Sequence, residues 1–512
     1  MTAAQQPAVR ASFRSRLRLP DRLRFPLWLQ GEYAPVAALS VLSFGVYTLF
    51  ALLGHRQFNT AGYDLGIFDQ AVRQYAHFHA PMVALKGPGY NIFGDHFHPI
   101  IAVAAPLYWI WDNPQTLLIL QSALIAVSVP VIYRFARRRT SARVSLTICF
   151  SYAFSWAFQT MVNFSFHEVA YGVPLLALAI DALDRNADRQ LLVYSGLLLL
   201  VREDMGILLI LIGVLRVLRR PRWPGIALLV AGVVMYELAT AVILPHFSPT
   251  GQFAYWQYGS TLGKDLPTAV VHSLTHPWHV VRLFFSPITK TRTLSLLLLP
   301  LLLLPLRSRY SLLALPLLAQ RFFEPAERYR LWEPHYHYNA LPWVILVLAM
   351  TDGAARLKVF DHRRLTAALC VVLIGFPIYA IALIPDVAPL HRLFTGQEFR
   401  LNAEMKYQQA ALGQIPSNVC VAADDRLAAH LTNRDWVTIP GLDNYRADLI
   451  VIDLSQKTVG GNDGPKPALA LATAQSHGYQ ITYRNGPIRI LTSPDYAGPS
   501  SECHPLGTGK PG

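Results

Sequence analysis

Charged residues are scarce in this sequence: Asp, Glu, Lys and Arg make up 15% of its 512 residues, whereas hydrophobic residues make up 53%. An ordinary soluble domain carries about 25% charged residues. The scarcity argues against a soluble globular protein, and repeated apolar runs such as 226–244 and 294–306 indicate a chain that crosses a membrane several times. We therefore expect an α-helical polytopic membrane bundle.

The signatures of several common enzymes are also missing. There is no G-x-x-x-x-G-K-[ST], no G-x-G-x-x-G opening a helix after a strand, no G-x-S-x-G and no H-E-x-x-H. Nucleotide-driven transport and the common hydrolase schemes therefore have no motif support. The four cysteines show no C-x-x-C spacing. Cys420 and Cys503 fall in the polar C-terminal part and could pair if that part lies outside the cytoplasm.

The net charge of +14 does not predict nucleic acid as a partner. The basic residues form short clusters between apolar runs, at 10–24, 134–143, 216–222 and 356–364. Cytoplasmic loops of membrane proteins carry such an excess of Lys and Arg. Placing these clusters inside predicts a cytoplasmic N-terminus, about eleven transmembrane helices and an outer C-terminal part.

The topology assigns each part of the chain to one side of the bilayer. We place the spans at 35–54, 115–134, 144–161, 169–183, 187–201, 206–218, 223–246, 293–306, 311–323, 339–352 and 365–385. The predicted parts are an Arg-rich N-terminus (1–34), a membrane domain (35–390) with outer loops at 55–114 and 247–292, an extracytoplasmic α/β domain (400–495) and a disordered tail (496–512). Short β-rich runs predict the α/β domain.

One apolar segment of the first outer loop, 98–112, is too short for a span. It predicts an interfacial helix that holds Tyr108, Trp109 and Trp111 at headgroup depth.

Ionisable residues interrupt the oily chain in five places, and this topology brings all five to the outer face. The clusters are "GYDLGIFDQ" (62–70), "GDHFHP" (94–99), "FHE" (166–168), "RED" (202–204) and "RYRLWEPHYHY" (328–338). A charge at the bilayer centre costs about 2.5–3.5 kcal/mol. We therefore expect "RED" to be the turn between two short helices, beside a polar cavity.

The first two clusters offer carboxylates and imidazoles. Asp64 is either a helix cap or a general base, whereas Asp69, five residues on, points to a different side of a helix. Asp95, His96 and His98 have donor types that suit a divalent metal ion. Phosphate binding by the imidazoles, or hydrogen bonding within the loop, are the alternatives.

The next two clusters combine both charge signs. His167 and Glu168 are either a solvated pair at a helix end or a second acid–base set near the first carboxylate. Arg202 suits a phosphate group, which it would bind through two nitrogens while Glu203 or Asp204 orients it. A purely structural ion pair is the rival interpretation.

The last cluster places cations among aromatic residues. Arg328, Arg330, His335 and His337 stand beside Trp332 and three tyrosines. Such a group suits an anionic lipid headgroup, and an ordinary aromatic belt with incidental cations is the alternative.

Five stretches in this order, "YDLGIFDQAV", "GDHFHPI", "FHEVAYGVPLLALA", "VREDMGILL" and "HYHYNALP", resemble the domain-of-unknown-function 2079 family of bacterial membrane proteins, over about residues 40–455. That family resembles the C-type superfamily of membrane glycosyltransferases, which use polyprenyl-phosphate sugars. The resemblance implies a C-type (GT-C-like) helical bundle in the bacterial cytoplasmic membrane, with catalytic acids in the first outer loop and a C-terminal outer domain.

The resemblance also implies a function: a sugar moves from a polyprenyl-phosphate donor to an extracytoplasmic envelope glycan, lipid or protein. Asp64 is then the base, with Asp69 or Glu168 as runner-up. Glu203 and Asp204 would hold Arg202. The candidates for phosphate or metal contacts are Arg202, His96, His98, His167, Arg328, His335 and His337. A divalent metal ion, with Asp95, His96 and His98 as ligands, is the only cofactor that these residues suggest.

Two other functions remain open from the sequence. Intramembrane charges mark the pathways of transporters and flippases as readily as catalytic sites, although no inverted repeat is visible here. A non-catalytic envelope assembly protein would use the C-terminal domain as its binding module.

Overall fold

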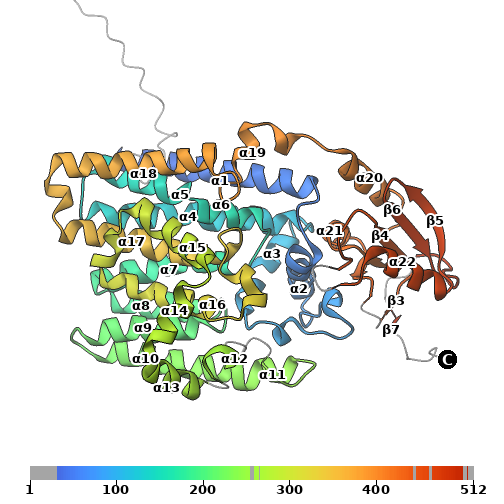
Figure 1. The fold of residues 1–512 in the computed structure, drawn as a ribbon, viewed down its shortest axis with the longest axis horizontal. Helices are drawn as coiled ribbons and strands as arrows, with labels where there is room; N and C mark the ends of the chain where they lie inside the picture. Colours follow the sequence, from blue (N-terminus) through green and yellow to red (C-terminus); the bar gives the residue numbers. More distant parts are fainter. Residues whose placement is uncertain are drawn as a thin grey trace, which may run out of the picture.

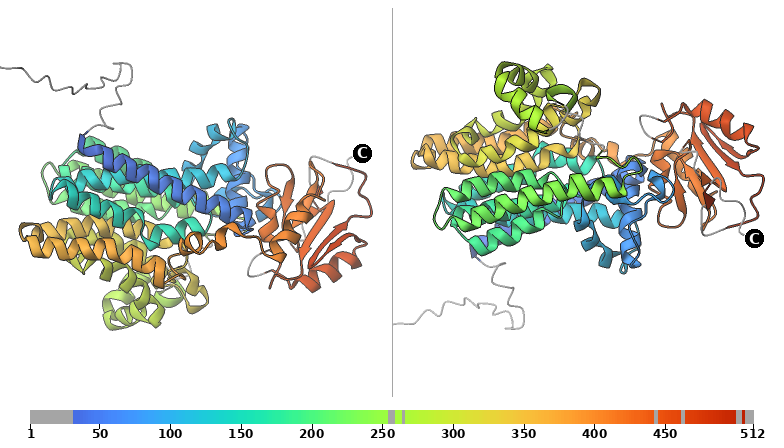
Figure 2. Two further views of the ribbon diagram at one scale, coloured as in Figure 1. Left: turned by 90° about the horizontal axis from the view of Figure 1, so that it is seen from above. Right: turned by 90° about the horizontal axis from the view of Figure 1, so that it is seen from below.

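The computed structural model describes residues 31–253, 259–263, 266–441, 445–460, 464–499 and 504–505. Its helices lie side by side in a bundle, and a smaller α/β unit is attached at one end (Figures 1 and 2). This is the predicted arrangement of a helical bundle with a small C-terminal sheet. The predicted Arg-rich segment lies outside the described residues up to position 30.

The bundle helices are α1 (Ala34–Arg56), α4 (Gln115–Arg137), α5 (Ala142–Ala153), α6 (Trp156–Asn163), α7 (Val169–Arg185), α8 (Asp188–Leu198), α9 (Met205–Val217), α10 (Trp223–Glu237), α11 (Leu244–Phe247), α15 (Ile288–Leu298), α16 (Ala314–Phe322), α17 (Ala340–Arg356) and α18 (Arg363–Leu383). Four helices of the described residues are long and apolar enough to cross a membrane: Gly31–Arg56, Gln115–Arg137, Trp223–Phe247 and Arg363–Leu383. The total of eleven spans stays a prediction.

The long helices differ in how deeply they lie in the bundle. The apolar stretch of α4 is 67% buried, whereas the corresponding stretches of the α10–α11 helix and of α18 are each 22% buried. Exposed valines and isoleucines such as Val230, Val371 and Ile378 cover the peripheral helices. Apolar surface that faces outward is what contact with lipid requires.

Two predicted spans are not continuous helices. The span at 144–161 divides into α5 and α6, because the Ser155 hydroxyl accepts a hydrogen bond from the Phe158 N–H and starts a new helix. In the span at 293–306, α15 ends at Leu298, and Leu302 and Leu303 adopt left-handed backbone conformations. Proline lacks the N–H that a helix interior needs, and two prolines, Pro300 and Pro305, stand in this run.

The carboxyl ends of several helices share one ionic network. Asp181 of α7 lies 2.7 Å from Arg138, and Asp184 of the same helix also pairs with it, at 2.8 Å. Asp352 of α17 pairs with Arg356 at 2.7 Å and with Arg139 at 3.4 Å. The predicted 134–143 basic cluster is therefore neutralised by acidic residues at one end of the bundle.

The five ionisable clusters lie at the opposite end. Glu168 directly precedes α7, Asp204 precedes α9 and Asn339 precedes α17. Each of α7 and α17 has 17 residues, so about 25 Å separates its two ends. "RED" stands between α8 and α9, as predicted. Which end faces the cytoplasm stays a prediction.

The two predicted outer loops contain helices. In the first, α2 (Ile67–Ala76) and α3 (Ala105–Tyr108) pack together. Trp109 and Trp111 are exposed, as an interfacial segment requires, but Tyr108 is buried against Asp69. In the second, α12 (Gly259–Leu262), α13 (Leu266–Thr275) and α14 (Pro277–Phe285) fold back along the bundle (Figure 1).

The C-terminal unit has an α/β fold. Its elements are α20 (Ala403–Leu412), β1 (Cys420–Ala423), α21 (Asp425–Ala428), β2 (Trp436–Thr438), β3 (Tyr445–Arg446), β4 (Leu449–Asp453), α22 (Pro467–Ser476), β5 (Gln480–Asn485), β6 (Ile488–Thr492) and β7 (His504–Pro505). The main sheet has the order β2-β1-β4-β6-β5, in which β1 is parallel to both β2 and β4.

The last residues differ from the prediction of a disordered tail in one respect. His504 and Pro505 form β7, which pairs with β3 in an antiparallel ladder. Cys420 is disulfide-bonded, while Cys503, its predicted partner, lies outside the described residues.

Candidate active site

Asp64 lies in a π-helical turn (Gly62–Gly66) that leads into α2. A Cβ atom at Gly62 would lie 2.8 Å from the Ala428 Cβ, so this glycine lets α21 approach the turn. The backbone N–H of Tyr63 donates to Asp425 Oδ1 at 2.9 Å. Helix α21 of the C-terminal domain therefore packs directly on the turn that carries Asp64. Single π-turns inside helical segments are frequent at functional sites.

His167 is an ionisable neighbour of Asp64. Its Nε2 lies 3.4 Å from Asp64 Oδ1, and its ring stacks on His337 with centroids 3.7 Å apart. Gln121 of α4 positions this turn, because its side chain donates to the Ser165 carbonyl at 2.7 Å and accepts from the His167 N–H at 3.2 Å. The structure thus joins the first, third and fifth predicted clusters.

A polar cavity of about 720 Å³ opens beside Asp64. Its bundle side is lined by Asn59, Thr60, Ala61, Asp64, Phe164, Ser165, Tyr329, Arg330 and Tyr336, and its other side by Glu404, Asp424, Asp425, Arg426 and residues 455–458 of the C-terminal domain. The Asp64 side chain is 25% exposed, so it is accessible from this cavity. The C-terminal domain forms about half of this cavity. The polar cavity predicted from the sequence was placed beside "RED", but residues 202–204 do not line this one.

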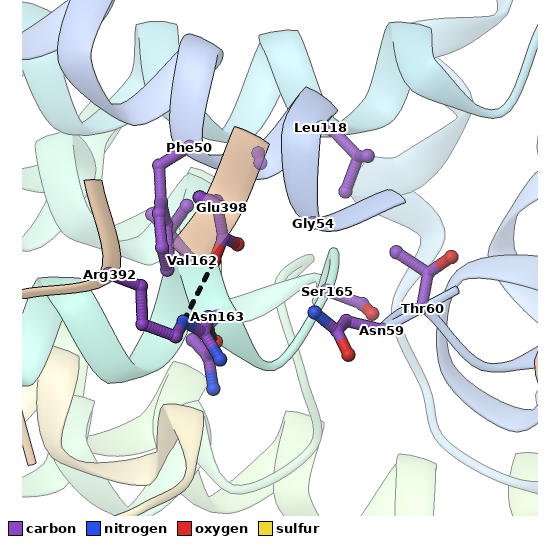
Figure 3. Close-up of a pocket in the computed structure, with 11 residues that line it drawn as sticks. Phe50, Gly54, Asn59, Thr60, Leu118, Val162, Asn163, Ser165, Arg392 and Glu398 are labelled. Carbon is purple, nitrogen blue, oxygen red and sulfur yellow. Dashed lines mark hydrogen bonds and ion pairs between the residues drawn. The ribbon is translucent and has the colours of Figure 1, made fainter. Parts of the chain in front are cut away.

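A smaller cavity of about 10 Å³ adjoins it and shares Asn59, Thr60 and Ser165 with it (Figure 3). Figure 3 shows Arg392 directed toward Glu398, and the two side chains form an ion pair at 3.0 Å. A space of this size holds about one water molecule. This cavity therefore belongs to the packing between α1 and the connection to the C-terminal domain.

The runner-up carboxylates have other partners. Asp69 is fully buried and accepts hydrogen bonds at 2.7 Å from both Tyr108 and Arg73. Glu168 is also buried, and its Oε1 lies 3.4 Å from Arg202. Neither side chain lines the cavity beside Asp64.

The two acidic residues of the "RED" turn have different hydrogen-bond partners. Asp204 accepts two hydrogen bonds from Arg202, at 2.8 and 2.6 Å, so it orients that guanidinium as predicted. Glu203 does not hold Arg202 but accepts from His96 at 2.7 Å and from the Phe97 N–H at 3.0 Å. Burial alone would lower the pKa of His96, but the Glu203 carboxylate outweighs it and raises this pKa to about 9.

The predicted metal ligands do not converge. Asp95 pairs with Lys86 at 2.9 Å, whereas His96 faces Glu203. His98 is buried, and burial lowers its pKa. The described residues hold no group of three or more His, Cys, Asp or Glu side chains that could bind a metal ion.

None of the seven predicted phosphate ligands lines the cavity beside Asp64. Arg328 is 3.8 Å from Glu324, and His335 lies near Glu333 and Asp386, at 3.7 and 3.6 Å. Arg330, which was not among the preferred candidates, lines the cavity instead.

Arg321 is a buried cation that sequence reasoning missed. It borders a small cavity of about 20 Å³ together with Arg202, His337 and Tyr338. Arg321 donates to the Leu317 and Leu331 carbonyls but has no ion pair within the described part of the chain. The signal was available, because an isolated arginine interrupts the apolar run 311–323.

Arg321 belongs to helix α16, and an apolar cavity lies on another face of this helix. It has a volume of about 280 Å³ and is lined by residues of α9, α10, α12, α13 and α16. Pro316, Ala319 and Phe323 line it, whereas Leu317 and Arg321 face the cationic cavity. Segment α16 thus separates an apolar space from a positively charged one.

A family model described as "Predicted membrane protein (DUF2079)" matches residues 54–483. The chain belongs to the DUF2079 family. The family match covers the bundle from the last residues of α1 onward, the first outer loop and most of the C-terminal domain, so it includes every residue of the candidate site. A search of curated proteins finds no match.

Among solved structures, the DUF2079 chain is similar to ArnT from Cupriavidus metallidurans bound to undecaprenyl phosphate, with 12% identity and a TM-score of 0.51 over 91% of this chain and 99% of that one. The apo form of ArnT gives the same identity and TM-score over 89% and 97%. An Archaeoglobus fulgidus oligosaccharyltransferase, tethered with an acceptor peptide, has 12% identity and a TM-score of 0.40 over 85% and 70%. The ArnT likeness shows a shared fold, and the predicted resemblance to the DUF2079 family is confirmed.

Proposed function

We propose that this DUF2079 protein is a membrane glycosyltransferase that moves a sugar from a polyprenyl-phosphate donor to an envelope acceptor on the outer face of the cytoplasmic membrane. The observation that carries the proposal is the position of Asp64. Its partly exposed carboxylate lies beside His167 and opens into a polar cavity at the end of an apolar helical bundle. A carboxylate so placed can accept a proton from a bound hydroxyl.

The transfer step needs only one proton acceptor from the protein. Asp64 takes the proton of the acceptor hydroxyl while that oxygen forms a bond to the anomeric carbon of the sugar. The bond from this carbon to the phosphate oxygen breaks, and its electron pair leaves with the polyprenyl phosphate. The anomeric centre develops positive charge in such reactions, and the leaving phosphate gains negative charge.

Buried cations beside the cavity suit the leaving phosphate. Arg321 and Arg202 border one small space with His337, and Arg321 has no acidic partner among the described residues. A buried cation without a counter-ion is stabilised by an anionic ligand. The apolar cavity on the other face of α16 suits an isoprenoid chain. The ArnT structure bound to undecaprenyl phosphate supports a donor of this class for a shared fold.

Replacement of Asp64 by Asn tests the proposal. The purified protein is reconstituted in vesicles with a radiolabelled polyprenyl-phosphate sugar and an envelope extract as acceptor. We expect Asp64→Asn to reduce transfer by about 10²–10⁴-fold, the usual contribution of a general base. Asp386→Asn is the matched control, because Asp386 pairs with Arg292 and His335 away from the cavity.

Three outcomes separate the competing functions. Transfer by the wild type that is lost in Asp64→Asn and kept in Asp386→Asn supports the transferase. Transfer that persists in Asp64→Asn removes Asp64 from the base role. Movement of the intact lipid-linked sugar across the vesicle membrane, without transfer, would instead support a flippase.

A further inference from the structure

The cavity beside Asp64 lies at the carboxyl edge of strands β1 and β4 in the C-terminal sheet. Strand β2 lies on one side of β1 and β4 on the other, so the chain connections diverge between β1 and β4. In open α/β sheets, ligands bind at the carboxyl ends of the strands where the connections diverge. Residues 424–426 follow β1 and residues 455–458 follow β4, and both segments line the cavity.

The segment after β4 is held in place by hydrogen bonds. Asp453 accepts from the Ser455 N–H at 2.9 Å and from its hydroxyl at 2.6 Å. Gln456 donates to Glu404 at 2.8 Å. This wall of the cavity is therefore ordered before any ligand arrives, which lowers the cost of binding.

Asp424 is a buried carboxylate, and one of its two oxygens lacks a hydrogen-bond donor within the described residues. Its side chain is 2% exposed and lines the cavity, and its Oδ2 has no hydrogen-bond partner within the described residues. Burial, with the neighbouring Asp453 and Asp425, raises its pKa to about 7. A buried polar oxygen without a donor is unfavourable, so a ligand hydroxyl that donates to it gains free energy.

The cavity also carries cations without acidic partners. Arg426 and Lys457 are exposed, and Arg330 is half-buried on the opposite, bundle side. None of the three forms an ion pair with a described residue, although many other arginines of this protein do. The inner carboxylates therefore suit hydroxyl groups, and the cations, two of them exposed, suit a negative group.

We propose that the carboxyl edge of the C-terminal sheet binds an anionic carbohydrate, whose hydroxyls contact Asp424 and Asp425 and whose negative group contacts Arg426, Lys457 and Arg330. The inference rests on the proposed function in one respect: the bound carbohydrate is the acceptor, with one hydroxyl directed to Asp64. A phosphorylated sugar and a uronic acid share this chemistry.

Titration calorimetry of the full chain in detergent tests this binding without a donor lipid. The probes are a phosphorylated tetrasaccharide, a tetragalacturonate and neutral maltotetraose. We expect at least one anionic probe to bind about tenfold or more tightly than the neutral one, with an affinity that falls as salt is added. The anionic probe that binds more tightly shows whether the site prefers the phosphate of a phosphorylated sugar or the carboxylate of a uronic acid.

Charge-removing variants decide whether this edge is the site. Arg426→Gln combined with Lys457→Gln should weaken binding of the anionic probe about tenfold or more. Arg484→Gln combined with Lys406→Gln removes the same charge from exposed positions elsewhere on the domain and should leave binding unchanged. Equal binding of charged and neutral probes, or equal losses in both double variants, would overturn the proposal.

Asp64→Asn separates this inference from the proposed function. The variant should bind the anionic probe within about twofold of the wild type while transfer is lost. If transfer needs Asp64 but no anionic probe binds the wild-type protein, only the acceptor inference fails. If binding behaves as expected while transfer persists in Asp64→Asn, the base assignment fails and the binding site stands.

Discussion

At the scale of single residues, neighbouring acids in one motif have different surroundings. Asp64 and Asp69 stand five positions apart in "YDLGIFDQ", yet Asp64 is partly exposed to a cavity and Asp69 is completely enclosed. Tyr108 and Arg73 satisfy both oxygens of Asp69. Breaking a buried ion pair leaves an unpaired charge, which is strongly destabilising. We therefore assign Asp69 to stability and propose Asp64 for chemistry.

Replacing each of the two aspartates should change the stability of the protein by a different amount. Thermal denaturation in detergent, followed by tryptophan fluorescence, measures this stability. Asp69→Asn should lower the free energy of unfolding by about 3 kcal/mol, because Arg73 loses its buried partner and keeps only the exposed Asp112. Asp64→Asn should change it by less than about 1 kcal/mol, since its contact with His167 is longer and partly exposed. Equal losses in the two variants would contradict this assignment.

The His96–Glu203 pair predicts that the stability of the folded protein falls at alkaline pH. Although burial opposes it, Glu203 raises the pKa of His96 to about 9. An unfolded histidine has a pKa of about 6.5, so the pair's stabilising contribution is complete below that pH and is lost as the pH rises through 9. The melting temperature of Glu203→Gln should therefore lie below that of the wild type at pH 6, and the gap should narrow by pH 10. A gap that stays constant would show that the pair is not ionic.

At the scale of elements, the site depends on one close approach between a π-turn and α21. Gly62 packs against Ala428, and the Tyr63 N–H donates a hydrogen bond to Asp425. The first outer loop and the C-terminal domain are therefore in direct contact. Gln70 of α2 adds a hydrogen bond to the Val437 carbonyl at 2.9 Å. The sequence motif around Asp64 is thus also a docking motif for the domain.

A methyl group at position 62 should loosen this docking. Gly62→Ala places a Cβ 2.8 Å from the Ala428 Cβ, and overpacking of this kind costs about 1–3 kcal/mol. We expect faster proteolysis in the connection 385–402. Gly45→Ala is the control, because a Cβ there meets nothing within 4 Å, and Ala428→Gly should partly rescue Gly62→Ala. Proteolysis that is unchanged in Gly62→Ala would disprove the docking role.

At the scale of the whole molecule, ionisable residues separate to two ends of an apolar bundle. One end holds the network of Arg138, Asp181 and Asp352, and the other holds Asp64 and the C-terminal domain. An apolar bundle between two charged ends is the arrangement that a bilayer imposes. The proposed reaction belongs to the end that carries the cavity.

Labelling of intact cells tests which end faces outward. In a protein whose Cys149 and Cys370 are replaced by alanine, Lys457→Cys should react with a membrane-impermeant maleimide. Lys358→Cys, at the opposite end, should react only after the cells are permeabilised. Both positions are exposed, so burial does not explain a difference. Labelling of both from one side would refute the topology and the proposed outer site.

The helical membrane character, most helix positions, the "RED" turn and the small α/β unit are predictable from the amino-acid sequence. These follow from local properties: hydropathy, the spacing of basic clusters, and β-rich runs. Long-range contacts decided the rest. Asp425 accepts a hydrogen bond from the Tyr63 N–H of the Asp64 turn, 362 positions away in the sequence. Glu203 hydrogen-bonds to His96, 107 positions away. No local pattern encodes such partners, because burial and neighbouring charge arise only when the chain is folded, and these choose which carboxylate faces the cavity.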